Sequence, residues 1–498
     1  MVKDIIDLLV IGGGINGVGI AADAAGRGLS VTLCEKEDLA GATSSYSSKM
    51  IHGGLRYLEN FEFRLVREAL HEREILLHVA PHLIQPLRII MPHDAHLRPY
   101  WIVRLGLYFY DHLGGKQSLP KCETLQFLPQ AEQPLASQYK KGFAYSDGRV
   151  DDARLVLSNA LAAKAHGANI LTRHEVVSAQ RVADAWEVQV VDRNTDTYKT
   201  FYCRGIANVT GPWVDKILQQ TLRLHSNQHI RLVKGSHIVV PRLYAGDHGY
   251  LLQNPDKRVI FVLPFQQDFH LIGTTDVDYQ GDPGNAKISI EEQNYLCNSV
   301  NLYFKQTLKP AQILWNFSGV RPLQYDEHAD PSKVTRDYSF TLDTKDDALP
   351  ALSVFGGKLT TYRRLAEHAL EKLAPYYPFM KPAWTAKAKL PGGEFNNYQL
   401  FFAELAKNYA WLPPAMLTRL ARAYGKRCYR ILADAIALHD LGEYFGGTLY
   451  ESEVRYLIAE EWAQSIEDIL WRRTKQGLFL NEAQIRYISK WLHKQKLP

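Results

Sequence analysis

The chain has 498 residues, of which 46% are hydrophobic and 22% charged, and its formal net charge is +5. The length predicts two or three domains with cores of ample size, and the charge is too small to favour a nucleic-acid partner. No window approaches 18 uninterrupted apolar residues, so no transmembrane helix is expected, and the amino terminus reads as a strand rather than a signal peptide. Five scattered cysteines without a CxxC pair predict reduced thiols in a cytosolic setting, and no metal site is expected.

The first sixty residues hold a dinucleotide-binding pattern. Residues 7–11 read as a buried parallel strand, and residues 18–27 read as a helix of small residues. Between them, Gly12, Gly14 and Gly17 satisfy the spacing G-x-G-x-x-G in the strand–turn–helix setting that the motif requires. Such a turn lets a pyrophosphate approach the backbone and the amino terminus of the helix.

An acidic residue follows the fingerprint at the expected distance. A second strand, residues 30–34, ends at Glu35, which lies 18 positions after Gly17. A carboxylate at this point can accept a hydrogen bond from an unphosphorylated adenosine ribose. The pattern therefore favours FAD or NAD over NADP.

Beyond the fingerprint, the predicted elements interleave. A polar loop at 38–45 precedes a helix at 64–79 and an aromatic, basic stretch at 98–114. Strand patterns and a glycine turn then follow at 169–171, 176–181, 186–191, 200–202, 205–211 and 231–275. A last strand at 352–355 and a helix at 360–373 precede amphipathic helices from residue 391 onward.

This order of elements distinguishes the two dinucleotides. A plain NAD domain would continue with alternating strands and helices, whereas here an antiparallel meander precedes the strand that ends at Gly211. A second glycine turn, residues 355–358, returns about three hundred residues after the first. Such a return suits a long FAD, whose flavin end needs its own helix amino terminus. The prediction is FAD.

Motifs along essentially the whole chain resemble those of the FAD-dependent glycerol-3-phosphate dehydrogenases, most closely the bacterial aerobic enzymes. The motifs that carry the resemblance are residues 11–17, 42–45, 49–58, 145–147, 208–213, 234–237, 273–276, 318–323, 335–338 and 355–363. The glycine motifs are shared with the wider amino-acid-oxidase-like group. The neighbourhoods of His237, Arg321 and Lys358 are more specific to glycerol phosphate.

The resemblance implies an α/β fold, in which an amino-acid-oxidase-like FAD-binding Rossmann domain is interleaved with an antiparallel-sheet cap domain that binds the substrate. The expected FAD domain is discontinuous and comprises residues 1–90, 145–230 and 331–390. Residues 91–144 and 231–330 would form the cap, and residues 391–498 a carboxy-terminal helical domain.

The same resemblance implies the site residues. His237, Arg321 and Lys358 are expected to be catalytic, with Arg56, Tyr57 and Arg336 binding substrate. The expected FAD-binding residues are Gly12, Gly13, Gly14, Asn16, Gly17, Glu35, Lys36, Thr43, Ser44, His52, Gly53, Gly54, Leu55, Val177, Gly211, Trp213, Gly357, Lys358, Leu359 and Thr360. A histidine near position 52 can attach to the flavin in relatives of the broader fold, but the resemblance implies noncovalent FAD.

Residue types support this chemistry. Arginine forks suit a dianionic phosphate, and an unperturbed imidazole titrates near pH ~6.5, so His237 is the expected base; the alternative is a core histidine bonded to backbone. Arg321 lies between Gly319 and Pro322, which predicts a constrained turn and a ligand role rather than surface pairing. Arg363 and Arg364 are expected to be surface salt-bridge residues on a helix.

The expected partners also follow from the resemblance: glycerol 3-phosphate, ubiquinone or menaquinone, and the lipid surface on the cytoplasmic side of the inner membrane. Residues 98–110 mix apolar, aromatic and basic side chains, as interfacial segments do, although a buried cap helix would fit equally well. A basic face at residues 421–432 is a weaker candidate for the membrane contact. A homodimer is left open. The alternatives in function are a glycerol-3-phosphate oxidase that makes peroxide and a noncatalytic flavin-binding module.

Overall fold

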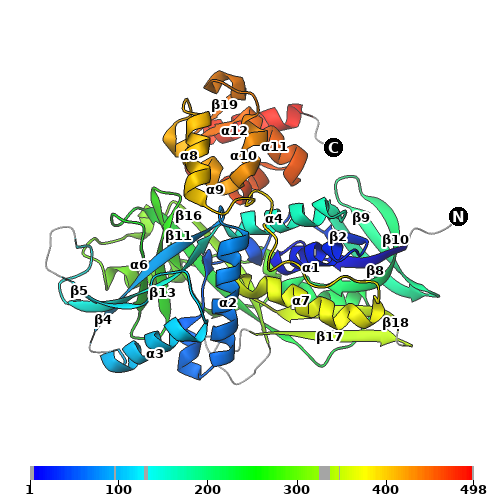
Figure 1. Ribbon diagram of the computed structural model, residues 1–498, viewed down its shortest axis with the longest axis horizontal. Helices are drawn as coiled ribbons and strands as arrows, with labels where there is room; N and C mark the ends of the chain where they lie inside the picture. Colours follow the sequence, from blue (N-terminus) through cyan, green and yellow to red (C-terminus); the bar gives the residue numbers. More distant parts are fainter. Residues whose placement is uncertain (1–4, 95–96, 128–132, 325–336, 347, 496–498) are drawn as a thin grey trace.

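Two β-sheets and a carboxy-terminal helical unit make up the fold (Figure 1). The computed structural model describes residues 5–94, 97–127, 133–324, 337–346 and 348–495. Within these ranges the helical unit lies at one end of the molecule and helix α3 at the opposite end (Figure 1).

The fingerprint lies at the centre of an eight-stranded sheet with the order β17-β18-β10-β1-β2-β7, to which β9 is added on β10 and β8 on β9. Strands β1, β2, β7, the end of β10 and β18 are parallel, as expected for a dinucleotide-binding sheet. The strands are β1 (Ile5–Ile11), β2 (Val31–Glu35), β7 (Asn169–Thr172), β8 (His174–Val182), β9 (Ala185–Asp192), β10 (Thr197–Asn208), β17 (Tyr338–Lys345) and β18 (Ala348–Gly356).

Strand β10 differs from the expectation. The two strands predicted at 200–202 and 205–211 are one continuous strand, which pairs antiparallel with β9 through its first half and parallel with β1 through its second. Arg204 interrupts the apolar pattern between the halves, which explains why sequence alone suggests a break.

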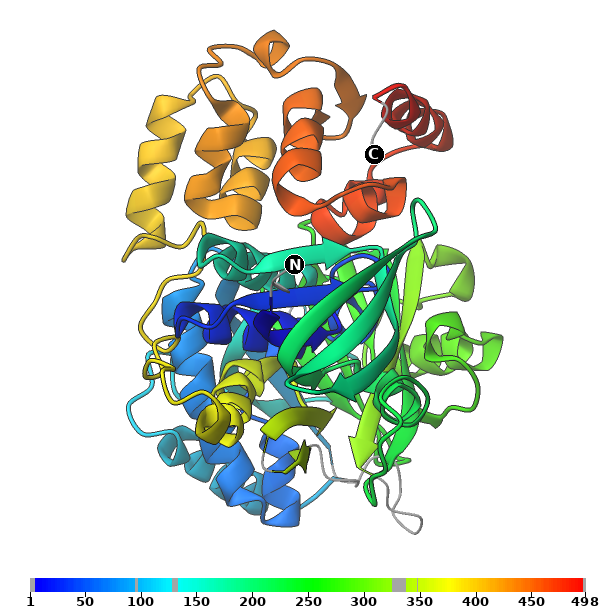
Figure 2. The ribbon, with the colours of Figure 1, turned by 90° about the vertical axis from the view of Figure 1, so that its right-hand side faces the viewer.

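Helices cover this sheet. They are α1 (Ile15–Gly26), α4 (Asp152–Ala165), the short α5 (Val214–Lys216) and α7 (Tyr362–Leu373), whereas α2 (Phe63–Val79) contacts strands of the second sheet. Helix α1 packs against both α4 and α7, and small residues allow this close approach (Figure 2). A Cβ on Gly19 would lie only 2.9 Å from the Tyr362 ring. The helix predicted from residue 360 begins as a 3-10 turn, Leu359–Thr361, before α7.

The second sheet has ten strands in the order β15-β11-β14-β13-β12-β4-β6-β3, with β16 paired to β11 and β5 to β6. Helices α3 (Tyr100–Leu113) and α6 (Ile290–Asn301) accompany it. Its strands are β3 (Met50–Ile51), β4 (Ile84–His93), β5 (Glu123–Gln126), β6 (Lys141–Val150), β11 (Ile230–Pro241), β12 (Gly249–Gln253), β13 (Val259–Phe265), β14 (Phe269–Gly273), β15 (Val277–Asp278) and β16 (Trp315–Gln324). Residues 84–90 and 145–150 therefore belong to this sheet, although the predicted boundaries assigned them to the FAD domain.

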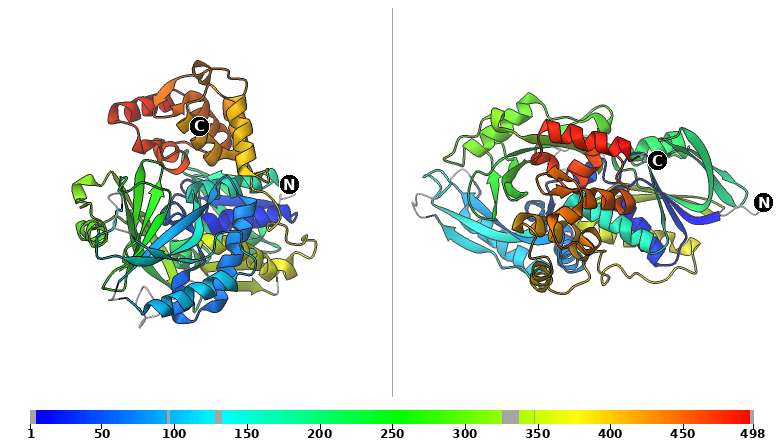
Figure 3. Two further views of the ribbon diagram at one scale, coloured as in Figure 1. Left: turned by 60° about the vertical axis from the view of Figure 1, so that its left-hand side comes forward. Right: turned by 90° about the horizontal axis from the view of Figure 1, so that it is seen from above.

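The carboxy-terminal unit packs its helices around a core of its own, separate from the cores of the two sheets (Figure 3). Its elements are α8 (Tyr398–Asn408), α9 (Pro414–Tyr424), α10 (Cys428–Leu432), β19 (Tyr444–Gly446), β20 (Leu449–Tyr450), α11 (Glu451–Glu461), the π-helical segment Asp468–Arg473 and α12 (Glu482–Lys494). Among the residues that the structure describes, no helix is long and apolar enough to cross a membrane.

Candidate active site

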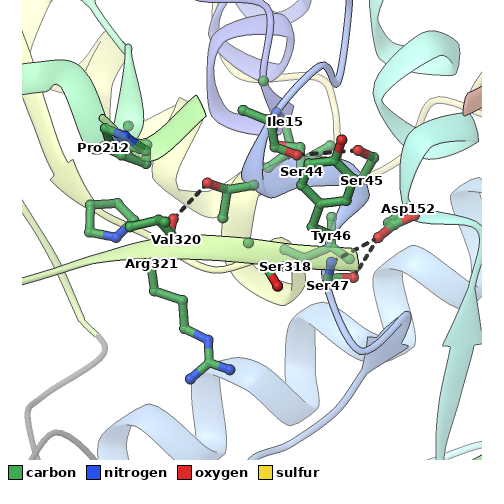
Figure 4. A pocket seen from close by; sticks show the side chains of 18 of the residues that line it. Ile15, Ser44, Ser45, Tyr46, Ser47, Asp152, Pro212, Ser318, Val320 and Arg321 are labelled. Carbon is green, nitrogen blue, oxygen red and sulfur yellow. Dashed lines mark hydrogen bonds between the residues drawn. The ribbon is translucent and has the colours of Figure 1, made fainter. Parts of the chain in front are cut away.

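A cavity of about 1910 Å³ is lined by residues of both sheets and of the carboxy-terminal unit. Pockets for drug-sized ligands occupy about 300–1,000 Å³, so this volume suits a dinucleotide together with a second small molecule. Figure 4 shows part of its wall, in which Arg321 extends from β16. The carbonyl of the neighbouring Val320 accepts a hydrogen bond from the Thr43 hydroxyl (2.7 Å).

The fingerprint turn forms one end of the cavity wall. Gly12 adopts φ +112° and a Cβ there would lie 2.6 Å from the Val209 carbonyl oxygen, so only glycine fits. Gly14 precedes α1 as its N-cap and provides no capping side chain, while the N–H of Ile15 donates to the Ser44 hydroxyl (3.0 Å). An uncapped helix amino terminus facing a cavity is suited to bind phosphate.

Glu35 ends β2 beside this turn, as predicted. Its Oε2 accepts the N–H of Gly13 (2.6 Å) and its Oε1 accepts that of Glu37 (2.8 Å). Burial raises the pKa of Glu35, although these hydrogen bonds oppose the shift. A carboxylate accepts about four hydrogen bonds, so lone pairs remain for a ribose hydroxyl.

The second glycine turn meets the first, as the FAD prediction requires. The side-chain amide of Asn16 donates to the carbonyl of Gly356 (3.4 Å), and a Cβ on Gly357 would lie 2.6 Å from that amide. Both glycines have positive φ, +78° and +101°. Residues 340 positions apart therefore form adjacent parts of one cradle.

Most predicted FAD-binding residues line the cavity. These are Gly12, Gly14, Asn16, Glu35, Lys36, Thr43, Ser44, His52, Gly54, Leu55, Val177, Gly211, Trp213, Gly357, Lys358, Leu359 and Thr360. Gly13, Gly17 and Gly53 are not among the lining residues. Gly17 packs on the carbonyl of Gly12, where a Cβ would lie 1.9 Å from the oxygen, and Gly53 donates its N–H to Tyr110 and Asp147.

His237 lies on β11 with only 2% of its surface exposed. Its Nε2 lies 2.9 Å from the Ser48 hydroxyl oxygen, and its ring stacks on Phe317 at 4.9 Å. Burial, together with the charges of Arg321 and Lys49, lowers the pKa of His237 well below 6.5. Burial and the nearby cations therefore favour the neutral form of the ring, in contrast to the unperturbed imidazole assumed from the sequence.

Arg321 lines the cavity, but the turn expected around it is wrong. It lies within β16 and pairs across the sheet with Val233 of β11. Its guanidinium forms an ion pair with Asp276 and donates to the Thr274 hydroxyl (2.8 Å). Gly235 makes room for this arrangement, since a Cβ there would lie 2.2 Å from Arg321 Nη2.

The remaining cations gather near the second glycine turn. The Lys358 ammonium lies 4.1 Å from the centre of the Tyr57 ring, and Arg56 also lines the cavity. The predicted substrate residue Arg336 falls outside the described residues.

Sequence reasoning missed several polar residues of this wall. Asp276 and Thr274 belong to the motif at residues 273–276, and their contacts with Arg321 are visible only in the structure. Ser48 has no sequence signal at all, because its importance follows only from its contact with His237. The next residue, Lys49, forms a buried ion pair with Asp152 (2.8 Å).

The expectation for Arg363 is also wrong. This residue is 5% exposed, and its guanidinium is paired with the buried carboxylates of Glu72 and Glu367. Arg364, by contrast, is partly exposed and pairs with Glu367 and Glu371, as expected. The two neighbours differ because α7 turns one side chain towards α2 and the other towards solvent.

Comparisons with known proteins agree with this geometry. The family model "FAD dependent oxidoreductase" matches residues 7–363, and the model "C-terminal domain of alpha-glycerophosphate oxidase" matches residues 383–492. The chain is 52% identical to a glycerol-3-phosphate dehydrogenase of Pseudomonas aeruginosa, over 99% of this chain and 96% of the relative. It is 51% identical to a D-erythritol 1-phosphate dehydrogenase of Brucella abortus, over 99% of this chain and 98% of the relative.

A solved structure also matches over nearly the whole length. The glycerol-3-phosphate dehydrogenase of Bacillus halodurans, complexed with FAD, aligns with a TM-score of 0.78 at 27% identity and covers 99% of this chain and 91% of its own. The uncapped start of α1, the Glu35 carboxylate and the joined glycine turns fit FAD. Motifs, geometry and relatives thus lead to one conclusion: the chain belongs to the FAD-dependent glycerol-3-phosphate dehydrogenase family.

Proposed function

We propose that the protein oxidises sn-glycerol 3-phosphate to dihydroxyacetone phosphate by hydride transfer to FAD and passes the electrons to a membrane quinone. The observation that carries this proposal is that a neutral, buried His237 and the cations Arg321, Lys358 and Arg56 all line one large cavity with the dinucleotide cradle. A proton acceptor and a phosphate-binding cluster are what oxidation of a polyol phosphate requires.

We assign binding of the substrate phosphate to the cations of the cavity. Arg321 is oriented by Asp276 and Thr274, so its guanidinium is held in place before the substrate arrives. Lys358 adds an ammonium at the second glycine turn, over the Tyr57 ring. A dianion bound between such groups would fix the position of the carbinol carbon.

We assign acceptance of the proton from the substrate C2 hydroxyl to His237. The C2 hydroxyl must lose its proton as the C2 hydride leaves, and FAD supplies the hydride acceptor. Because burial and the charges of Arg321 and Lys49 lower the pKa of His237, its neutral form is favoured, and this is the form that can accept the proton. The Ser48 hydroxyl, 2.9 Å from Nε2, orients the ring, and Phe317 supports its face. His237→Asn should reduce turnover strongly while FAD stays bound; unchanged turnover would end this assignment.

The decisive experiment is an anaerobic absorbance spectrum. Adding glycerol 3-phosphate to the purified holoprotein without oxygen should bleach the flavin band, whereas glycerol without phosphate should not. A spectrum that does not change with any polyol phosphate would contradict the proposal and favour a noncatalytic flavin-binding module.

D-Erythritol 1-phosphate is the second candidate substrate, because a relative named for it is as similar to this chain as one named for glycerol 3-phosphate. Both molecules carry a phosphate and a secondary alcohol, so the same cations and base would serve either. The ratio of kcat/KM for the two substrates under identical conditions decides between them, and a ratio in favour of the longer polyol would replace the glycerol assignment.

The electron acceptor is assigned to quinone, with oxygen as the alternative. The name of the carboxy-terminal family model mentions an oxidase, so both acceptors must be compared. Turnover with a soluble quinone analogue should exceed turnover with air, with little peroxide formed. One peroxide per substrate at full rate in air would identify an oxidase.

The membrane contact is assigned to an aromatic face on α3. Trp101 (67% exposed), Leu105, Tyr108 (59%) and Phe109 recur at the spacing of one helix face, and the exposed Phe63 ring lies 6.2 Å from Phe109. The segment therefore is not the buried cap helix that sequence left as an alternative. Exposed apolar residues gathered in this way suit insertion into a lipid interface on the cytoplasmic side of the inner membrane.

The basic face at 421–432 is a weaker candidate for this contact. Arg427 and Arg430 are paired with Glu460, and Arg422 packs over the Tyr398 ring. Sedimentation with anionic phospholipid vesicles tests the choice. The double variant Trp101→Ser, Tyr108→Ser should lose binding, whereas Tyr198→Ser, which removes an equally exposed aromatic ring on β10, should not. Equal binding of all three proteins would assign the contact elsewhere.

A further inference from the structure

The carboxy-terminal unit reaches the cavity. Its π-helical segment Asp468–Arg473 and the residues beside it contribute Glu467, Trp471, Arg472 and Lys475 to the cavity wall. Figure 1 shows this unit above α4 and α1. A domain that only stabilised the fold would not need to contribute to this wall.

The main contact between this segment and the nucleotide sheet is Asp38. Its carboxylate is buried, at 1% exposure, and receives Arg473 Nη2 at 2.8 Å, Arg473 Nη1 and Arg472 Nε. Arg173 lies 3.4 Å away and also binds Asp468 (2.8 Å), which Arg472 contacts in turn. Burial would raise the pKa of Asp468, but the three arginines lower it well below its usual range. Two carboxylates and three guanidinium groups therefore form one charged cluster.

Asp38 is three residues beyond Glu35, and the residues after it lie directly on the fingerprint. The N–H of Ala40 donates to the carbonyl of Gly13 (3.1 Å), and the Leu39 side chain packs so closely that a Cβ on Gly13 would lie 2.8 Å from it. Ala40 adopts φ +58°, a conformation that a non-glycine residue keeps only when its surroundings hold it. The loop that starts at Asp38 thus sets the shape of the glycine turn from outside.

We propose that Arg472 and Arg473 are positioning residues for the dinucleotide: by holding Asp38, they keep Leu39 and Ala40 against Gly13 and so raise the affinity for FAD. The carboxy-terminal unit then acts as a clamp on the adenosine end of the cofactor site. This proposal rests on FAD binding by the family and not on the identity of the polyol phosphate.

Docking and positioning can be separated experimentally. The unit is also attached by Lys475 to Asp151 (2.6 Å), by Arg154 to Glu461 (2.9 Å) and by the stacking of Trp471 on Trp315 (4.6 Å). None of these contacts involves Asp38. Replacing Arg472 alone therefore leaves the carboxy-terminal unit docked, while the replacement removes one of the ion pairs that fix Asp38 and the loop after it.

The test is a titration of the full-length apoprotein with FAD, followed by flavin fluorescence, for Arg472→Met, Asp38→Asn and the double variant. Each single variant should raise the Kd for FAD about tenfold, the ratio that corresponds to roughly 1.4 kcal/mol. The double variant should raise it no further than Asp38→Asn alone, because Arg472 acts on the dinucleotide site only through Asp38. Arg486→Met, on the exposed side of α12, is the matched control and should leave the Kd unchanged.

Two results would overturn the proposal. A Kd within twofold of the parent for both single variants, with lowered melting temperatures, would show that the cluster serves only the stability of the fold. Additive effects in the double variant would show that Arg472 contacts FAD by itself and does not act through Asp38. Arg472→Lys, which keeps one cation near the carboxylate, should recover part of the affinity.

Discussion

Gly235→Ala offers a steric test of the role of Arg321, because the change touches neither the charge nor the hydrogen-bonding groups of the site. The methyl group would lie 2.2 Å from Arg321 Nη2 and 2.6 Å from the Thr274 hydroxyl oxygen. Carbon and nitrogen atoms in contact need about 3.5 Å, so the guanidinium must move by roughly 1 Å or more. Gly235 lies in a regular strand without positive φ, so the backbone itself tolerates alanine.

The expected effect follows from that displacement. A misplacement of about 1 Å at a substrate-positioning group costs on the order of 10²-fold, or about 2.7 kcal/mol, in catalytic efficiency. Gly235→Ala should therefore lower kcat/KM for glycerol 3-phosphate by about two orders of magnitude, mainly through KM, with FAD still bound. Initial rates with a soluble acceptor measure this.

Gly106→Ala is the control, since among the described residues no heavy atom other than those of its chain neighbours and of its own helix backbone lies within 4 Å of a Cβ at that position. It should leave kcat/KM unchanged. If Gly235→Ala retains the KM of the parent within twofold, Arg321 does not bind the phosphate and the steric reasoning fails.

Three further predictions concern stability and the cofactor. Arg363→Met leaves the buried Glu72 unpaired and should lower the free energy of unfolding by about 3–5 kcal/mol. Arg364→Met should lower it by less than about 1 kcal/mol. Urea unfolding of both variants measures the difference, and equal midpoints would contradict the buried pairing. Burial lowers the pKa of His270 to about 3, and its Nδ1 accepts the N–H of Leu243 (2.9 Å). Below about pH 6.5 the unfolded chain binds a proton at His270 that the folded chain does not bind. The free energy of unfolding should therefore decrease as pH falls, by about 2 kcal/mol at pH 5 from this residue. His270→Gln should show a smaller loss of stability between pH 7 and pH 5, and an unchanged loss would refute the assignment. Acid precipitation should release the flavin into the supernatant, because FAD is predicted to be noncovalent; a yellow pellet would indicate a bond such as one to His52.

The two glycine turns and the acidic residue after the first could be predicted from the sequence because their determinants are local. A short motif encodes the glycines at positions 12 and 14 and the carboxylate of Glu35 that follows them. The same argument applies to Gly357 at the second turn. The turn predicted around Arg321 and the exposure predicted for Arg363 are wrong for the opposite reason. The turn around Arg321 is replaced by a strand because β11 pairs with the whole of β16, and Arg363 is buried because α2 supplies Glu72, which lies 291 positions away.

The state of His237 likewise could not be read from its neighbours in sequence. Its pKa depends on burial and on Arg321 and Lys49, which come from other strands and loops. Asp38 illustrates the same limit, since its partners Arg472 and Arg473 come more than four hundred positions later. Long-range ion pairs leave no periodic pattern in the chain.

The strand order of the eight-stranded sheet has a consequence for biosynthesis. Strands β1 and β2 leave the ribosome early, but β18, which pairs with β10, is made more than three hundred residues after β2. At about 5–20 residues per second, roughly 15 to 60 s pass before the nascent sheet can close. During that interval the apolar strands around the fingerprint lack their final neighbours, and the two glycine turns cannot meet through Asn16. The complete cradle for the dinucleotide therefore cannot form before residue 357 has been synthesised.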